Sequence, residues 1–254
     1  LFVAFDTSYY IDWATSQCNF NGEDFVAMLE FAAAFPSQEE MSARYEDPNF
    51  EWESDMARIK RGEQSLLQVS ISDFIYGFAD AKYAFGEPDL TYIGFPVTEG
   101  NGHVAAFDTG LAMSATCKNK DGAWAFIRTV LTENYQNEYG WSIPTNQKVF
   151  DAKLKKACTP EYYTDPVTGE QVEQSKGGIG WGDGETVEVY ALSESDAQTI
   201  RDLVNAVDRT FSYDESILNI IVEESAPFFA GQKTAQQAAE LIQSRMSLYV
   251  NEQK

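Results

Sequence analysis

Several kinds of residue are scarce in this sequence, and each scarcity excludes a class of protein. There is one histidine, His103, which excludes metal sites built from several histidines. The three cysteines, Cys18, Cys117 and Cys158, are few, odd in number and far apart, so they predict no disulfide framework, and none has the spacing of metal ligands. Pairing of Cys117 with Cys158 stays open. We expect no metal and no cofactor.

Long apolar runs are also missing. No run approaches the roughly 20 residues that a membrane-spanning helix needs, and no signal peptide is visible. The chain begins Leu1-Phe2-Val3-Ala4-Phe5, without methionine and already strand-like. We therefore expect a piece of a longer protein, whose leader or lipid anchor lies outside the sequence given.

Basic residues are fewer than half as numerous as acidic residues. Lys and Arg total 18 against 40 Asp and Glu, a formal net charge of −22. Such a surface repels phosphate backbones and anionic lipid, so a nucleic-acid partner is not expected. The simplest interpretation is that the acidic residues keep the protein soluble.

What remains is a globular composition, with 44% hydrophobic and 14% aromatic residues. Apolar periodicity and capping residues predict helices, and alternation and turn residues predict strands. The predicted helices cover about 21–35, 55–61, 119–136, 145–157, 193–207, 214–226 and 234–250. The predicted strands are 67–71, 90–95, 111–115 and a hairpin over 161–172, and 177–184 is predicted as a glycine-rich loop. This mixture is typical of an α/β or α+β fold.

The residues that could carry catalysis are weak candidates. No serine lies in a nucleophile elbow that would pair with His103. Acid pairs are abundant in so acidic a chain, so they say little about glycosidase chemistry. Glu223 and Glu224 are better explained by a solvated helix face or an ion pair between helices.

Aromatic residues next to polar ones are more informative. Sugar rings present flat C–H faces that pack on aromatic rings, while carboxylates and hydroxyls bind sugar hydroxyls. Each ring taken alone is more often a core residue than a ligand contact. The candidate ligand-binding residues are Ser72, Asp73, Phe74, Tyr76, Phe107, Asp108, Trp181 and Tyr213.

An ordered series of short motifs resembles the family 1 extracellular solute-binding proteins, the maltose-binding-protein-like group of ABC importers. Each motif is weak, and their order along the chain carries the resemblance. The motifs are Ile93-Gly94-Phe95-Pro96, Gly110 to Ala115, Cys117 to Ile127 (a "K-N-K-x-x-A-W-x-F" pattern), Ile143 to Asn146 ("P-x-N"), and a closing "G-x-x-T" and "I-Q-x-R" at Gly231 to Thr234 and Ile242 to Arg245.

The resemblance implies two α/β lobes joined by crossing strands, a type II periplasmic-binding-protein architecture truncated at its N-terminal lobe. Residues 1–105 are then the first part of the C-terminal lobe. Residues 106–158 are a hinge strand and a segment of the N-terminal lobe, with the crossing at Ala106 to Ser114. Residues 159–254 return to the C-terminal lobe and carry its closing helices.

The same resemblance implies a binding protein rather than an enzyme. It would capture a small solute, expected to be a mono- or oligosaccharide, between the lobes and deliver it to the transmembrane subunits of an ABC permease. A monomer outside the cell, held by a lipid anchor, is expected. Two alternatives stay open: a secreted glycoside hydrolase using two carboxylates, and a surface adhesion module. The solute itself cannot be named from the sequence.

Overall fold

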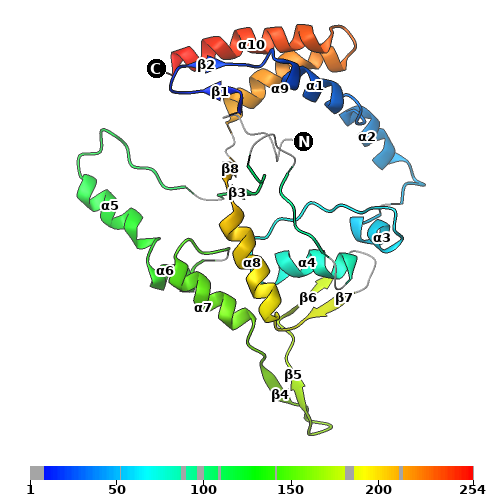
Figure 1. The fold of residues 1–254 in the computed structure, drawn as a ribbon, viewed down its shortest axis with the longest axis vertical. Helices are drawn as coiled ribbons and strands as arrows, with labels where there is room; N and C mark the ends of the chain where they lie inside the picture. Colours follow the sequence, from blue (N-terminus) through cyan, green and yellow to red (C-terminus); the bar gives the residue numbers. More distant parts are fainter. Residues whose placement is uncertain are drawn as a thin grey trace. The chain divides into compact units, whose positions relative to one another are not determined.

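The structure is a computed structural model in which the chain forms two compact units, each discontinuous in sequence (Figure 1). Unit 1 comprises Leu1–Glu51, Phe95–Phe107 and Asp208–Lys254, and unit 2 comprises Trp52–Gly94 and Asp108–Val207. Helix and strand make up 48% and 10% of the residues. The fold is therefore mixed α and β, as expected, although its sheets are short. The structure describes residues 9–51, 53–86, 90–95, 100–107, 110–140, 142–180, 186–211 and 214–253.

Unit 1 is built mainly from helices. Two pairs of short strands accompany them: β1 with β2 antiparallel, and β3 with β8 parallel. Its elements are β1 (Ile11–Asp12), β2 (Gln17–Cys18), α1 (Glu23–Ala32), α2 (Gln38–Glu46), β3 (Val104–Ala106), β8 (Arg209–Phe211), α9 (Glu215–Phe229) and α10 (Ala235–Glu252).

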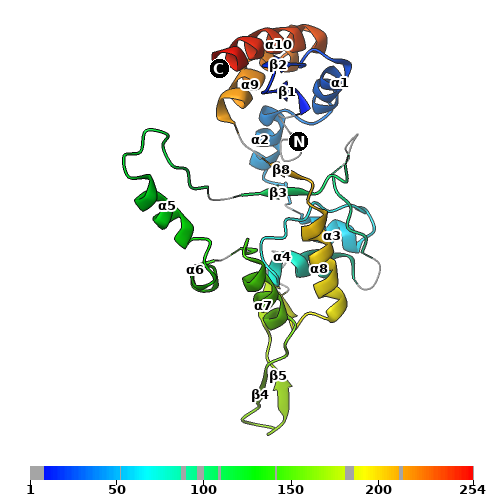
Figure 2. The same cartoon turned by 60° about the vertical axis from the view of Figure 1, so that its left-hand side comes forward.

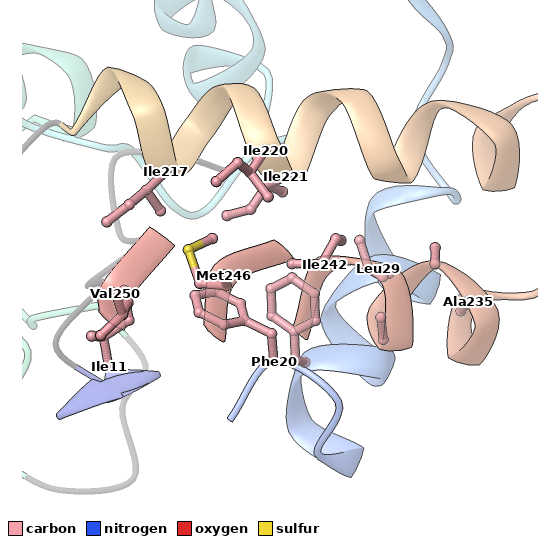
Figure 3. Close-up of a cluster of buried hydrophobic side chains, with 13 residues drawn as sticks. Ile11, Phe20, Leu29, Ile217, Ile220, Ile221, Ala235, Ile242, Met246 and Val250 are labelled. Carbon is pink, nitrogen blue, oxygen red and sulfur yellow. The ribbon is translucent and has the colours of Figure 1, made fainter. Parts of the chain in front are cut away.

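The long C-terminal helix α10 organises the core of unit 1 (Figure 3). Its buried residues recur every three or four positions, which places them on one face of a helix: Ala235, Ala238, Ala239, Ile242, Met246 and Val250. This face packs against α9 and α1, which lie beside α10 in both views (Figures 1 and 2). Phe20 and Phe25 fill the space between them, edge to face with ring centroids 5.1 Å apart.

Unit 2 combines helices with two antiparallel hairpins, β4–β5 and β6–β7. Its largest buried cluster joins α4, α7 and α8 through Phe74, Phe78, Phe150, Leu154 and Ile200, among others. Its elements are α3 (Asp55–Lys60), α4 (Tyr76–Phe85), α5 (Lys120–Thr129), α6 (Glu133–Glu138), α7 (Gln147–Ala157), β4 (Tyr162–Thr164), β5 (Gln171–Glu173), β6 (Gly177–Gly180), β7 (Thr186–Val189) and α8 (Glu194–Ala206).

Capping signals located most helix starts correctly. Ser193 and Thr234 each form a capping box, with Asp196 and Gln237 as the third helical residue. The hairpin over 161–172 is also confirmed. Asp165 donates its N–H to Glu170 O at 2.8 Å, and Gly169 adopts a φ of +74° that a residue with a side chain rarely takes.

Four predictions of local structure were wrong. Helix α1 is capped at Gly22 rather than Asn21. The helix expected over 119–136 breaks into α5 and α6, because Thr132 Oγ1 accepts the Tyr135 N–H and starts a new helix. Part of the expected glycine-rich loop forms β6, which pairs with β7.

The fourth error concerns the expected strands at 67–71, 90–95 and 111–115, none of which is a strand. The first of these still alternates in exposure, with Leu67, Val69 and Ile71 half-buried. Alternating burial alone does not produce a β-sheet, because a strand also needs a neighbouring strand whose backbone groups can form hydrogen bonds with it. Here the chain lies instead against the start of α4, where a Cβ on Gly77 would come within 2.8 Å of Ser70 O.

Strands β3 and β8 lie next to two of the boundaries between the units. The chain leaves unit 1 after Phe107 and returns at Asp208, and the paired strands are Val104–Ala106 and Arg209–Phe211. The first boundary falls within the segment predicted to cross between lobes. Residues 52–94 are grouped with 108–207 in unit 2, whereas the solute-binding resemblance places them with the rest of 1–105 in the C-terminal lobe. The lobe boundaries stay a prediction.

Candidate functional site

The predicted ligand residues 72–76 lie in unit 2, at the start of α4. Ser72 is exposed, and its carbonyl oxygen accepts the Ile143 N–H at 3.0 Å. Asp73 Oδ1 accepts the N–H groups of Ile75 and Tyr76, both at 2.7 Å. Asp73 therefore has a local role, because it satisfies backbone donors at the beginning of a helix.

The two rings of this segment have opposite surroundings. Phe74 is 7% exposed and meets Phe150 edge to face, with ring centroids 5.1 Å apart. Tyr76 is 46% exposed, and its hydroxyl lies against the backbone of Gly177 on β6. Of this predicted group, Tyr76 presents an aromatic surface to solvent and Phe74 belongs to the core cluster.

Of the other four predicted ligand residues, the structure describes Phe107. Phe107 belongs to unit 1, where it follows β3 and is 63% exposed. Asp108, Trp181 and Tyr213 lie outside the described residues.

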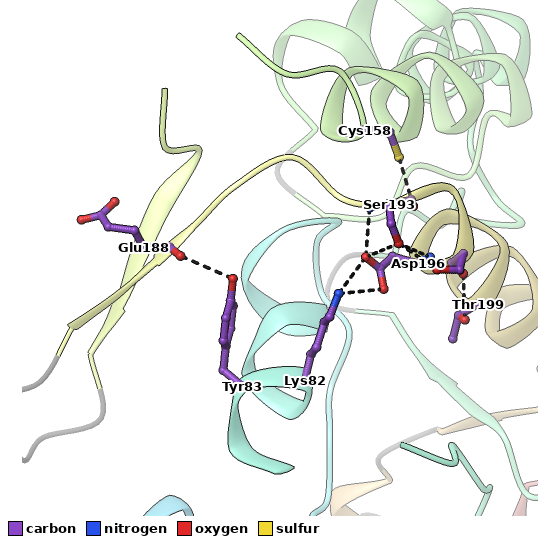
Figure 4. A network of polar contacts seen from close by, with 8 residues as sticks. Lys82, Tyr83, Cys158, Glu188, Ser193, Asp196 and Thr199 are labelled. Atoms are coloured by element: carbon purple, nitrogen blue, oxygen red, sulfur yellow. Dashed lines mark hydrogen bonds and ion pairs between the residues drawn. The ribbon is translucent and has the colours of Figure 1, made fainter. Parts of the chain in front are cut away.

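A polar network in unit 2 was not predicted from the sequence (Figure 4). Lys82 Nζ on α4 lies 3.1 and 3.3 Å from the two carboxylate oxygens of Asp196 on α8. Asp196 also accepts hydrogen bonds from the backbone and side chain of Ser193. Only the Ser193–Asp196 part of this network could be found as a local signal, because Lys82 is 114 residues away from Asp196.

The network controls the charge of Asp196. Burial by itself raises the pKa of this carboxyl, but the hydrogen bonds from Ser193 and the Lys82 ammonium outweigh burial and lower the pKa below its ordinary value. Asp196 is therefore ionised at neutral pH. The contacts of Asp196 with Lys82 and Ser193 give this carboxylate a structural role, because they join α4 to α8 and cap the start of α8.

Tyr92 lies close to the same network. Its ring stacks on Phe78 with centroids 5.7 Å apart, and burial, followed by the charge of Asp196, raises the pKa of its hydroxyl to about 12. The hydroxyl oxygen is buried and has no hydrogen-bond partner within the part of the chain that the structure describes. It stays protonated at neutral pH.

A groove lies between α7 and α8 in unit 2. Its volume is about 460 Å³, within the range of small-molecule sites. Buried Leu154 and Ala197 contribute to its lining. Its polar lining residues are Asp151, Lys155, Cys158, Thr159, Glu194, Gln198 and Arg201.

One end of this groove is held by contacts between the end of α7 and the start of α8. The Leu192 N–H donates to Ala157 O at 3.1 Å, and the Cys158 thiol donates to Ser193 O at 4.0 Å. Burial raises the pKa of the Cys158 thiol, and the charges of Glu194 and Asp196 raise it further. The thiol is therefore neutral near pH 7 and is no activated nucleophile.

The cysteine and histidine side chains form no metal site among the described residues. All three cysteines are free, so Cys117 and Cys158 do not pair. Over the same residues no group of three or more His, Cys, Asp or Glu could hold a metal ion. His103 Nδ1 lies 3.0 Å from Asn101 Oδ1 in a loop. Glu223 and Glu224 each form an ion pair with Arg245 at 2.7 Å, which is one of the two explanations expected for them.

Comparison with known proteins identifies no family for this chain. No protein-family model matches the chain, and no curated protein matches it. No helix in the described ranges is both long enough and apolar enough to cross a membrane.

Proposed function

We propose that this chain is part of an extracellular solute-binding protein that delivers a small solute, most simply a carbohydrate, to the permease of an ABC importer. In this proposal the chain has no catalytic activity, and its partners are the solute and the transmembrane subunits of the permease. A lipid anchor would hold the protein at the cell surface.

The observation that carries the proposal is the order of the sequence motifs. The "K-N-K-x-x-A-W-x-F" pattern precedes "P-x-N", and the "G-x-x-T" and "I-Q-x-R" patterns close the chain. Three of these motifs coincide with helix starts, because Asn119, Asn146 and Thr234 cap α5, α7 and α10.

The test is a thermal-shift screen of the full-length protein against mono- and oligosaccharides. A ligand that binds only the folded state at 100 times its dissociation constant adds about 2.7 kcal/mol to the free energy of unfolding. We expect a concentration-dependent rise in Tm with one sugar or a few related sugars, and recovery of the sugar unchanged after long incubation.

Two results would contradict the proposal in different ways. Release of hydrolysis products, lost when a pair of carboxylates is changed to amides, would favour the glycoside hydrolase. Absence of any stabilising solute, together with saturable binding to a purified macromolecule, would favour the adhesion module.

A further inference from the structure

The α7–α8 groove carries equal numbers of cationic and anionic side chains. Lys155 and Arg201 are cationic, and Asp151 and Glu194 are anionic. Arg201 Nη1 and Asp151 Oδ1 form an ion pair. Among the residues that the structure describes, the ammonium of Lys155 and the carboxylate of Glu194 have neither a hydrogen-bond partner nor an ion-pair partner. One groove therefore offers a positive group and a negative group that are both exposed and free to meet a ligand.

Arg201 is held in a geometry that suits a planar anion. Its guanidinium lies over the ring of Phe150, 5.6 Å from the centroid, while one nitrogen donates to Asp151. A guanidinium has five N–H donors, so this single hydrogen bond leaves most of them available. The stacked, paired guanidinium is already ordered, which lowers the entropy cost of binding a carboxylate.

The remaining lining favours a small ligand with an aliphatic part. Leu154 and Ala197 supply apolar surface, and the Cys158 thiol is neutral at physiological pH. The Gln198 amide donates to Asp202 Oδ1 at 2.8 Å, which leaves its carbonyl oxygen as an acceptor. A simple anion would be repelled by Glu194, and a simple cation would be repelled by Lys155.

We propose that the α7–α8 groove binds a zwitterionic solute, an aliphatic α-amino acid, with its carboxylate on Arg201 and Lys155 and its ammonium on Glu194. The aliphatic side chain then lies against Leu154 and Ala197. This site lies within unit 2 and does not depend on the carbohydrate-binding proposal.

The test is calorimetric titration of the full chain with L-leucine and with two compounds that each lack one of its charges. 4-Methylpentanoate lacks the ammonium, and 3-methylbutylamine lacks the carboxylate. We expect saturable binding of L-leucine and at least tenfold weaker binding of both single-charge compounds, because each leaves one charged side chain of the groove without its partner.

Variants connect the binding to this groove. Glu194→Gln and Lys155→Met should each weaken L-leucine binding at least tenfold without lowering Tm, because neither side chain has a partner in the described structure. Lys156→Met removes a neighbouring lysine outside the groove lining and should leave the affinity unchanged. Absence of saturable leucine binding, equal affinity for the single-charge compounds, or insensitivity to both groove variants would overturn the proposal.

Discussion

At the scale of single residues, Phe74 and Tyr76 show how two neighbouring aromatic rings acquire different roles. Phe74 is enclosed by α4 and α7, whereas nearly half of the Tyr76 side chain is accessible to solvent. A ring that stacks on a ligand can be removed with little loss of stability, but a ring enclosed in a core cannot. The surroundings of each ring therefore predict the result of changing it.

We expect Phe74→Ala to lower the free energy of unfolding by about 3–5 kcal/mol, because it leaves a cavity beside Phe150. Tyr76→Ala should cost clearly less. Urea unfolding of both variants, followed by far-ultraviolet circular dichroism, measures the difference. Equal stability losses would contradict the contrast in burial. Sugar titration of the same variants in the full-length protein tests whether either ring contacts the solute.

The Lys82–Asp196 pair gives a prediction about pH. The folded-state pKa of Asp196 is lowered below the ordinary 3.8, so its ionised form stabilises the folded state. That contribution is fully present above the unfolded-state pKa and is lost as the pH falls through the folded-state value. Asp196→Asn should therefore cost about 1–3 kcal/mol at pH 7, and the cost should shrink as the pH falls below about 3.8.

Urea unfolding of the wild-type chain and of Asp196→Asn between pH 7 and pH 3 measures this cost. Lys82→Met should show a stability loss of the same sign at pH 7. Asp202→Asn, at an exposed position on the same helix, provides the control and should change stability little. A cost for Asp196→Asn that stays constant or grows on acidification would show that the carboxylate charge is not what stabilises unit 2.

At the scale of elements, α5 and α10 differ most in how many of their residues are buried. Six residues of α10 are buried, whereas α5 has no buried residue, and its Trp124 and Phe126 are 49% and 69% exposed. An isolated helix of ten residues is marginal in water, because few hydrogen bonds offset the cost of nucleation. Most helical stability in proteins comes from packing, and no described residue of α5 is buried by it.

We expect the amides of α5 to exchange with deuterium orders of magnitude faster than the central amides of α10. Local opening of a helix without buried contacts costs little free energy, whereas opening of α10 exposes the core of unit 1. Hydrogen exchange read by mass spectrometry on peptides covering 120–129 and 238–250 makes the comparison. Slow exchange in α5 would mean that another surface covers it in solution.

At the scale of the whole molecule, the net charge of −22 is the main electrostatic influence on stability. Acidic residues repel one another more strongly in the folded chain than in the expanded unfolded chain, and salt screens this repulsion. We expect Tm to rise as NaCl increases from 10 to 150 mM, where the Debye length falls from about 30 to 8 Å.

Choline chloride at matched ionic strength should produce the same rise in Tm, which would exclude a specific effect of sodium. Differential scanning calorimetry provides the measurement. A fall in Tm with salt would mean that favourable ion pairs, such as those of Arg245 with Glu223 and Glu224, outweigh the overall repulsion. Surface pairs of this kind are usually worth less than 1 kcal/mol, so this outcome is not expected.

The sequence by itself determined the features that depend on a few neighbouring residues. Ser193 with Asp196 and Thr234 with Gln237 predicted the starts of α8 and α10, because a cap reaches only to the next turn. Gly169 predicted the hairpin turn for the same reason, since its positive φ is a local requirement. Local periodicity also predicted a mixed α and β composition, although the strands expected at 67–71, 90–95 and 111–115 did not form.

Only the tertiary structure decided the features that depend on distant partners. It placed Phe74 in the core, buried no described residue of α5, paired β3 with β8, and joined Lys82 to Asp196 across 114 residues. The alternation at Leu67 to Ile71 predicted a strand, yet no ladder formed. The physical reason is the same in each case. The local sequence pattern shows which residues can be buried or paired, but the partner surface comes from segments that are distant in the sequence.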